Sequence, residues 1–216
     1  MKELQMKQLT LATLFILFII TNSTATNNYH KNHYATISHL HQVFEKVKRN
    51  SNVSQKALAE AFSFYEKNRY KRRLSPNYIA IADYTKVALD KRLYIINIHS
   101  GEVSSYLVAH GVNSGEKYGR VLYAGNAKGS FKTPTGFFKV GTKEGITTKK
   151  RYRYLSVTGL ETKNRNAKKR QILLHTAWYV AKAGRSYGCF AIEPKDRKEI
   201  FSRLKTALLY SYTGGA

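Results

Sequence analysis

The sequence is short of cysteine, proline and acidic side chains. Its single cysteine, Cys189, cannot form a disulfide within the chain, and 3 prolines in 216 residues disfavour a proline-rich linker. Hydrophobic residues make up 43% of the chain and aromatic residues 12%, which excludes a wholly disordered protein. Because the 16 tyrosines favour strands, the composition predicts a β-rich fold. The length gives room for one sizeable domain with an appendage.

Acidic residues are few, since 13 Asp and Glu stand against 37 Lys and Arg and leave a net charge of +24. This charge predicts attraction to polyanionic partners such as the polymers of a cell envelope, although solubility and non-specific adhesion explain it equally well. Residues 149–154 interleave cations with tyrosines, as single-strand nucleic-acid binders do. No nucleic-acid-binding motif accompanies them or the basic segment 163–170. We therefore expect solvated or glycan-facing surfaces and no specific nucleic-acid partner.

The N-terminus has the only long apolar run. Lys2 and Lys7 form a basic start, residues 9–20 are apolar apart from two threonines, and small residues lead to a cleavage point after Ala25. This order is typical of a signal peptide and predicts export to the periplasm or cell envelope. The alternative is an uncleaved anchor, but the run is shorter than the ~20 residues of a membrane-spanning helix. No later run is apolar enough to span a membrane, so the mature chain is predicted to lack a transmembrane segment.

Three segments are expected along the chain: a signal peptide over residues 1–25, a helical N-terminal region over 26–74 and a β-rich domain over 75–216. Helical spacing of apolar residues predicts one helix around residues 39–47 and a second after Ser54, which is a plausible N-cap. A Ser-Pro step then ends the helical region.

No metal or cofactor site stands out. His30 and His33 have a spacing that a metal site can use, but no cysteine or close set of carboxylates accompanies them, so we expect a solvated tail and no metal. The glycine-rich segment 113–129 carries neither of the phosphate-binding glycine motifs, which argues against a nucleotide. A loop of this length is often functional, so we expect a flap or a groove wall here.

From Tyr78 onward the pattern favours strands. Residues 93–98 and 103–108 flank a short turn and are predicted to form a hairpin. His110 follows the second strand and is a candidate to line a site, while a structural role is equally open. Pro194 is placed to begin a C-terminal helix. The expected apolar face of that helix consists of Ile200, Phe201, Leu204 and Leu208.

A histidine and the cysteine each adjoin a short apolar run. Residues 172–174 lead into His175, and the second run, residues 189–192, begins with Cys189. Both runs are predicted to be buried strands, and a short glycine-containing link lets them lie side by side with His175 near Cys189. An imidazole beside a thiol can take its proton and leave the nucleophilic thiolate. The alternative is an inert buried cysteine, which is common, although an unpaired cysteine in an exported chain indicates a reactive thiol.

The residues around this pair resemble a known signature. Leu-His-Thr-Ala-Trp at 174–178 and Arg-Ser-Tyr-Gly-Cys-Phe-Ala-Ile at 185–192 are similar to the His and Ser/Thr-x-Gly-Cys motifs of the L,D-transpeptidase catalytic domain (YkuD-type). The form here looks most like a divergent murein L,D-transpeptidase branch. Weaker similar blocks lie at 91–97, 108–111 and 129–136. The family often has His where Tyr187 stands, and Arg or Asn where Phe190 and Ala191 stand.

The resemblance implies a mainly β (α+β) catalytic domain with an N-terminal helical pair and a C-terminal helix. It implies an exported enzyme that cross-links peptidoglycan stem peptides through a cysteine thioester, with Cys189 as the nucleophile and His175 as the general base. Gly188 would allow close approach of the substrate, and the N–H groups of Gly188 and Cys189 are the expected oxyanion donors. Four further residues are candidates to bind or orient the substrate or the imidazole: Ser186, Thr176, Tyr187 and His110. No metal or organic cofactor is needed.

Two other functions stay open. If water resolves the thioester, the same Cys-His site makes the protein an L,D-carboxypeptidase or a hydrolase of cross-links. If Cys189 is inert, the chain is a non-catalytic basic protein that binds the cell envelope. The sequence leaves open the stem-peptide preference, the oligomeric state and the role of the N-terminal helices.

Overall fold

The strands predicted from residue 78 onward build one sheet. In a computed structural model that describes residues 39–216, eight strands pair in the order β3-β2-β1-β8-β4-β5-β6-β7. They are β1 (Tyr78–Asp83), β2 (Leu93–Asn97), β3 (Val103–Tyr106), β4 (Gly136–Ile146), β5 (Arg153–Gly159), β6 (Leu173–Thr176), β7 (Phe190–Ile192) and β8 (Leu208–Tyr212). The predicted mainly β fold with N-terminal helices and a C-terminal helix is confirmed. The predicted signal peptide, His30 and His33 lie outside the described residues.

Most neighbouring strands are antiparallel. The predicted hairpin is confirmed as β2 and β3, in which Leu93 pairs with Tyr106 and Ile96 with Val103. Within the described chain two pairs are parallel, β1 with β8 and β6 with β7. A parallel pair needs a crossover connection. Between β6 and β7 this crossover is short and contains the 3-10 helix η2 (Trp178–Lys182).

The C-terminal helix ends earlier than the sequence indicates. The helix α3 covers Arg197–Leu204 and buries the predicted Ile200, Phe201 and Leu204. Leu208, which the helical spacing assigns to the same face, instead begins β8, so that expectation is wrong. β8 lies between β1 and β4, and all of its residues are buried. A strand covered on both faces has no alternating pattern, and periodicity alone does not separate it from a helix end.

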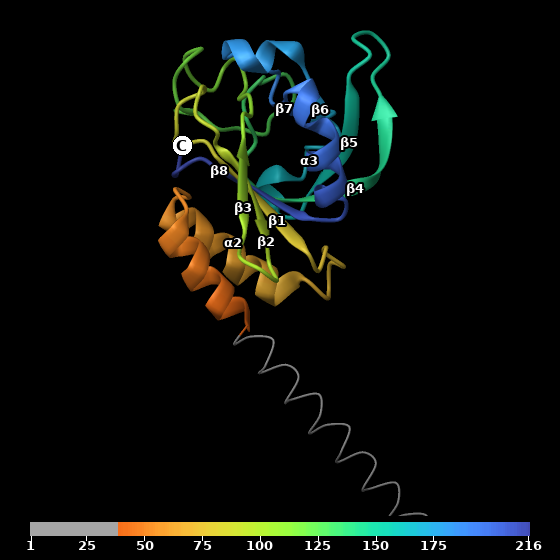
Figure 1. The fold of residues 1–216 in the computed structure, drawn as a ribbon. Coiled ribbons are helices and arrows are strands. Elements are labelled where there is room, and N and C mark those ends of the chain that lie inside the picture. Colours follow the sequence, from red (N-terminus) through yellow and green to blue (C-terminus); the bar gives the residue numbers. More distant parts are fainter. Residues whose placement is uncertain (1–38) are drawn as a thin grey trace, which may run out of the picture. The chain divides into compact units, whose positions relative to one another are not determined.

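The two faces of the sheet carry different layers. The main core lies on one face, where the rings of Phe138 and Phe190 meet edge to face at 5.4 Å. The helix α2 (Gln55–Asn68) covers the other face, where the Phe64 ring stacks on Phe137 at 4.0 Å (Figure 1). Ser54 stands at the predicted N-cap position of α2. The residues from 39 to 50 are helical as well.

The sheet curls until its two ends meet near the predicted site. After β3, the Ala109 N–H donates to the Ala191 carbonyl at 2.9 Å, and the Ser186 N–H donates to the His110 carbonyl at 2.8 Å. Gly111 and Ser186 also form a parallel bridge. Residues 109–111 therefore lie against the turn that precedes Cys189, although 78 positions separate Gly111 from Cys189 along the chain.

Candidate active site

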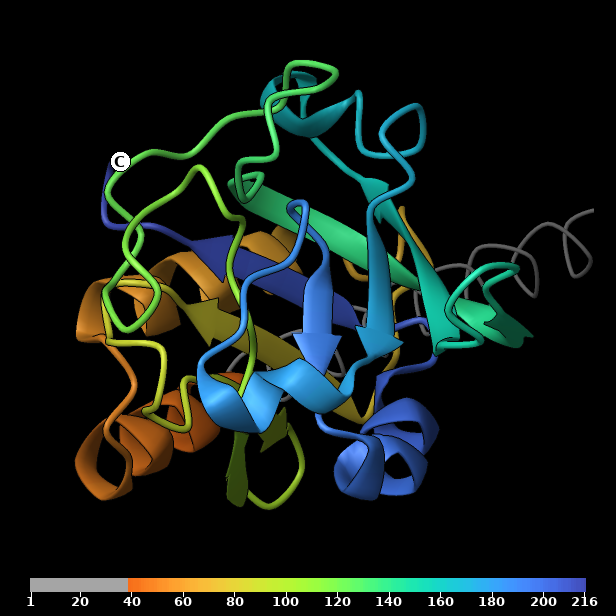
Figure 2. The same cartoon turned by 90° about the horizontal axis from the view of Figure 1, so that it is seen from above.

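The parallel pair β6–β7 places His175 and Cys189 on one face of the sheet. Leu174 lies opposite Phe190 and His175 opposite Ala191, so the same register sets Cys189 beside Leu173. Because side chains alternate between faces, Leu173, His175 and Cys189 share the face opposite to the main core. His175 is one strand across from Cys189, about 4.8 Å, and two residues along, roughly 6.6 Å. The expected side-by-side arrangement of the two strands is confirmed (Figure 2).

Hydrogen bonding fixes the tautomer of His175. Its Nδ1 lies 3.0 Å from the Thr176 carbonyl oxygen. A carbonyl only accepts, so Nδ1 carries the proton and Nε2 keeps its lone pair. The Tyr152 ring stacks on the imidazole with a centroid distance of 5.2 Å and an interplanar angle of 7°. Burial lowers the pKa of His175, so at neutral pH the ring is an uncharged base.

Thr176 orients the imidazole through its backbone. The sequence left open which part of Thr176 does so. Its carbonyl accepts a hydrogen bond from the imidazole Nδ1–H. Its Oγ1 accepts a hydrogen bond from the Arg153 N–H of β5 at 3.2 Å. The hydroxyl thus joins β6 to β5.

The Cys189 sulfur is half-buried and protonated at rest. Its thiol donates to the Gln171 carbonyl at 3.5 Å. Burial raises the pKa of Cys189, while the Leu173 N–H and the positive charge of Arg170 oppose that rise. A base is therefore needed to form the thiolate at neutral pH.

Ser186 holds the turn before the nucleophile. Its Oγ donates to the Cys189 carbonyl at 2.7 Å and accepts the Gly188 N–H at 3.1 Å. The side chain is buried, so it fixes the turn from inside. Because the Gly188 N–H already has this acceptor, it is not free to bind an oxyanion. The expectation that Gly188 and Cys189 supply the oxyanion donors stays a prediction, and in this conformation the Cys189 N–H is the stronger candidate.

Gly188 is required by space as well as by conformation. Its φ is +108°, which side-chain-bearing residues rarely adopt. A Cβ built on it would lie 2.5 Å from the Lys132 carbonyl oxygen and 2.6 Å from Arg170 Nη2. The glycine thus lets two distant segments pack directly on the cysteine turn.

His110 lies in the interior, next to the turn that carries Ser186. The ring is fully buried, its Nδ1 lies 2.8 Å from Arg92 Nη2, and its Nε2 lies 3.0 Å from the Glu116 carbonyl. Arginine only donates, so Nδ1 accepts and Nε2 carries the proton. Both ring nitrogens thus have protein partners, which favours the structural role of His110, and a role in binding substrate stays a prediction. Its backbone carbonyl instead holds Ser186.

Exposed aromatic side chains form a rim on the cysteine turn and on the segment after β6. Tyr187 is 70% exposed and Trp178 is 66% exposed. The Tyr187 ring lies 4.8 Å from that of Phe131, which comes from the end of the glycine-rich loop. Tyr187 is thus accessible to a ligand and is not a packing residue of the core.

Three residues next to the candidate site carry no signal in the sequence. Tyr152 lies in one basic run and Arg170 in another, and both runs are typical of solvated surface. Arg92 is a fully buried cation whose guanidinium also donates to the carbonyls of Val108 and Lys86. No local pattern marks them, because each acts on a partner that is distant in the chain.

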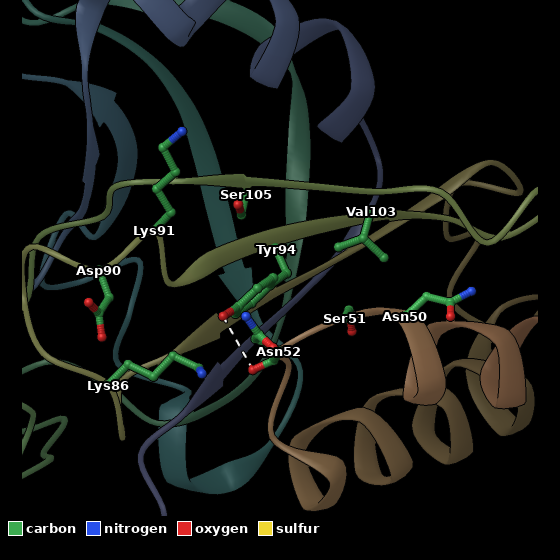
Figure 3. A pocket seen from close by; sticks show the side chains of 9 residues that line it. All are labelled: Asn50, Ser51, Asn52, Lys86, Asp90, Lys91, Tyr94, Val103 and Ser105. Carbon is green, nitrogen blue, oxygen red and sulfur yellow. Dashed lines mark hydrogen bonds between the residues drawn. The ribbon is translucent and has the colours of Figure 1, made fainter.

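A separate cavity of about 480 Å³ lies on the β2–β3 face, where Tyr94 is paired with Ser105 (Figure 3). Lys86, Lys91 and the loop 50–52 complete its polar lining. No residue that lines it carries a thiol or an imidazole, so it does not supply thioester chemistry.

The described residues contain neither a group of metal ligands nor a membrane-spanning helix. Between residues 39 and 216, no three or more His, Cys, Asp or Glu side chains are grouped as metal ligands. None of the helices there has the length and apolar character that crossing a membrane requires.

A known family of catalytic domains matches most of the chain. A family model described as the L,D-transpeptidase catalytic domain matches residues 49–212. Among solved structures, the helical cell shape determining protein Pgp2 from Campylobacter jejuni has 15% identity and a TM-score of 0.40, over 63% of this chain and 48% of that one. A mutant of Pgp2 gives 13% identity and a TM-score of 0.38, over 63% and 47%. This chain thus spans about half the length of those structures. No curated protein matches it.

The first prediction concerns Gly188. Gly188→Ala should lower the free energy of unfolding by about 3 kcal/mol or more, because strain at positive φ adds to overpacking against Lys132 and Arg170. Gly129→Ala is the matched control, since Gly129 also has a positive φ of +75° but nothing within 4 Å of its Cβ position. It should cost only about 1–2 kcal/mol. Urea unfolding of both variants measures the difference, and equal losses would contradict the packing argument.

The second prediction concerns pH and His110. Burial and the Arg92 charge lower the pKa of His110 from 6.5 to about 4. The unfolded chain therefore binds a proton that the folded chain refuses between these values, so stability is full above pH about 6.5 and falls as the pH drops toward about 4. The loss is on the order of 3 kcal/mol.

His110→Gln should flatten this dependence. Unfolding free energies measured from pH 7 to pH 4.5 give the slope for each protein. An unchanged slope in His110→Gln would assign the acid sensitivity to other groups.

Proposed function

The chain belongs to the family of L,D-transpeptidase catalytic domains, and on that premise we propose that it is an exported enzyme that cross-links peptidoglycan stem peptides through a thioester on Cys189. The observation that carries the proposal is one shared sheet face, on which a neutral His175 with a free Nε2 lies diagonally across from a partly exposed thiol. Export rests on the predicted signal peptide over residues 1–25.

Acylation is the first half of the proposed reaction. His175 Nε2 takes the proton from Cys189, and the sulfur attacks the carbonyl between the L-centre of the third stem residue and the D-alanine at position four. A carbon–sulfur bond forms, and the peptide carbon–nitrogen bond breaks. His175 returns the proton to the leaving amine, so D-alanine departs as a neutral amine product and the thioester remains.

Deacylation is the second half. The amine of a second stem peptide attacks the thioester carbonyl, and His175 accepts a proton from that amine. The carbon–sulfur bond breaks, a new amide bond forms, and the departing thiolate takes the proton back from His175, which restores the thiol. The Cys189 N–H is the proposed oxyanion donor in both steps, since the Gly188 N–H is bound to Ser186.

The charge of the protein suits this substrate. Stem peptides and other envelope polymers carry carboxylates or phosphates, and a net charge of +24 attracts them. The rim residues Tyr187, on the cysteine turn, and Phe131 offer aromatic surface to the bound peptide.

The third prediction tests the activated thiol. After exposure to a carbapenem, which acylates the cysteine of this family, intact-protein mass spectrometry should show one adduct on the wild type and none on Cys189→Ala. His175→Ala should react about 10²–10⁴-fold more slowly, because the general base is missing. The fold should persist in both variants, and circular dichroism checks it.

Other outcomes decide between the alternatives. A wild type without an adduct, whose thiol also resists a small alkylating agent, would contradict the proposal and favour a non-catalytic envelope-binding protein. If the adduct forms, defined muropeptides with an amine acceptor distinguish the products. Cross-linked dimers support the transpeptidase, whereas released D-alanine or cleaved cross-links without dimers would show that water is the acceptor.

A further inference from the structure

Arg170 joins the glycine-rich loop to the cysteine turn. Its Nη1 donates to the Gly125 carbonyl at 2.8 Å and to Asn126 Oδ1 at 3.1 Å. Its Nη2 donates to the Lys132 carbonyl at 2.6 Å. All three acceptors belong to the loop that precedes β4, so one guanidinium gathers both ends of the segment 125–132.

The same guanidinium packs on the residue before the nucleophile. Arg170 Nη2 lies only 2.6 Å from the position that a Cβ on Gly188 would take. The adjacent Gln171 carbonyl accepts a hydrogen bond from the Cys189 thiol. Asn166, one turn earlier, donates through Nδ2 to the Asn126 carbonyl at 3.2 Å. The segment 166–171 therefore contacts the loop on one side and the Cys189 turn on the other.

The charge of Arg170 is not neutralised by a carboxylate. Its acceptors are two backbone carbonyls and one side-chain amide, all uncharged. Among residues 39–216, the ionisable group that interacts with it is Cys189. The positive charge lowers the pKa of the Cys189 thiol against the effect of burial. A half-buried cation without a counter-ion costs solvation energy, and a thiolate offsets that cost.

We propose that Arg170 is a positioning residue of the Cys189 site, which fastens the loop 125–132 onto the cysteine turn and supplies the positive charge that balances the sulfur anion. The proposal deepens the proposed function, because that reaction passes through the thiolate and regenerates it when the thioester breaks. His175 is left neutral as the proton acceptor. Arg170 thus provides the fixed charge, and His175 moves the proton.

The fourth prediction measures the thiol directly. Cys189 is the only cysteine in the chain, so the rate of iodoacetamide alkylation against pH reports its titration. Arg170→Gln should raise the midpoint of that profile by about 0.5–1 pH unit, which slows alkylation at neutral pH about three- to tenfold. Lys169→Gln is the matched control, because it removes one exposed charge from the neighbouring position, and it should leave the midpoint unchanged.

Hydrogen exchange of the segment 125–132 separates the fastening role from the charge. Arg170→Lys keeps the charge but loses the planar guanidinium that donates to several acceptors at once. It should therefore speed amide hydrogen exchange in this segment, while the alkylation midpoint stays near that of the wild type. Arg170→Gln should change both readouts. An unchanged midpoint in Arg170→Gln would overturn the charge role, and unchanged exchange in Arg170→Lys would overturn the fastening role.

Neither readout needs peptidoglycan. A chain that passes both tests but forms no carbapenem adduct contradicts only the proposed function. If Arg170→Gln does not fold, Arg170→Lys carries the test, and a midpoint in Arg170→Lys raised well above that of the wild type would overturn the charge role.

Discussion

The closure of the sheet at residues 109–111 and 186–191 is the constraint on which the site depends. A three-residue strand such as β7 has little pairing of its own, and β6 covers only one of its edges. The other edge is held by the Ala109 N–H and by the bridge between Gly111 and Ser186. An unpaired edge beside a reactive turn would leave backbone donors and acceptors without partners, which is costly in a buried place. The closure removes that cost and fixes where Cys189 begins.

Buried cations stabilise this closure from two sides. Arg92 donates to backbone carbonyls and to His110, and so shapes the chain as it leaves β3. Arg170 does the equivalent for the loop that returns toward β4. Arginine suits both places because its planar fork satisfies several carbonyls at once and stays charged when buried. Arg170 thus holds the part of the long loop that leads into β4, Arg92 holds the chain just before the loop, and Gly111 and Gly188 leave room for the backbone to approach.

Local pattern was enough to predict the strands and the His–Cys pair, since two apolar runs with a short link between them have few ways to pack. The same reasoning failed where the cause is remote. β8 lies in the middle of the sheet, so its burial on both faces erased the alternation, and Leu208 looked like a helix residue. Tyr152 and Arg170 lie in basic runs that composition assigns to solvent, yet each packs on a site residue from another segment. Whether the Gly188 N–H is available to an oxyanion also cannot be predicted from the sequence, because it depends on whether the Ser186 hydroxyl accepts that N–H.

The electrostatics of the site favour a neutral resting pair. Burial acts on both partners in the same direction, because it penalises each charged form: the pKa of Cys189 rises and that of His175 falls. A permanent thiolate–imidazolium pair is therefore disfavoured, and the neutral thiol donates a hydrogen bond to the Gln171 carbonyl. A neutral thiol is less exposed to oxidation, since susceptibility follows thiolate character. In the proposed reaction, proton transfer to His175 then belongs to the moment of attack, when a bound carbonyl draws charge from the sulfur toward the Cys189 N–H. The proposed anion needs a fixed positive neighbour, and within the described residues Arg170 lies beside the cysteine turn without a carboxylate to compete for its charge.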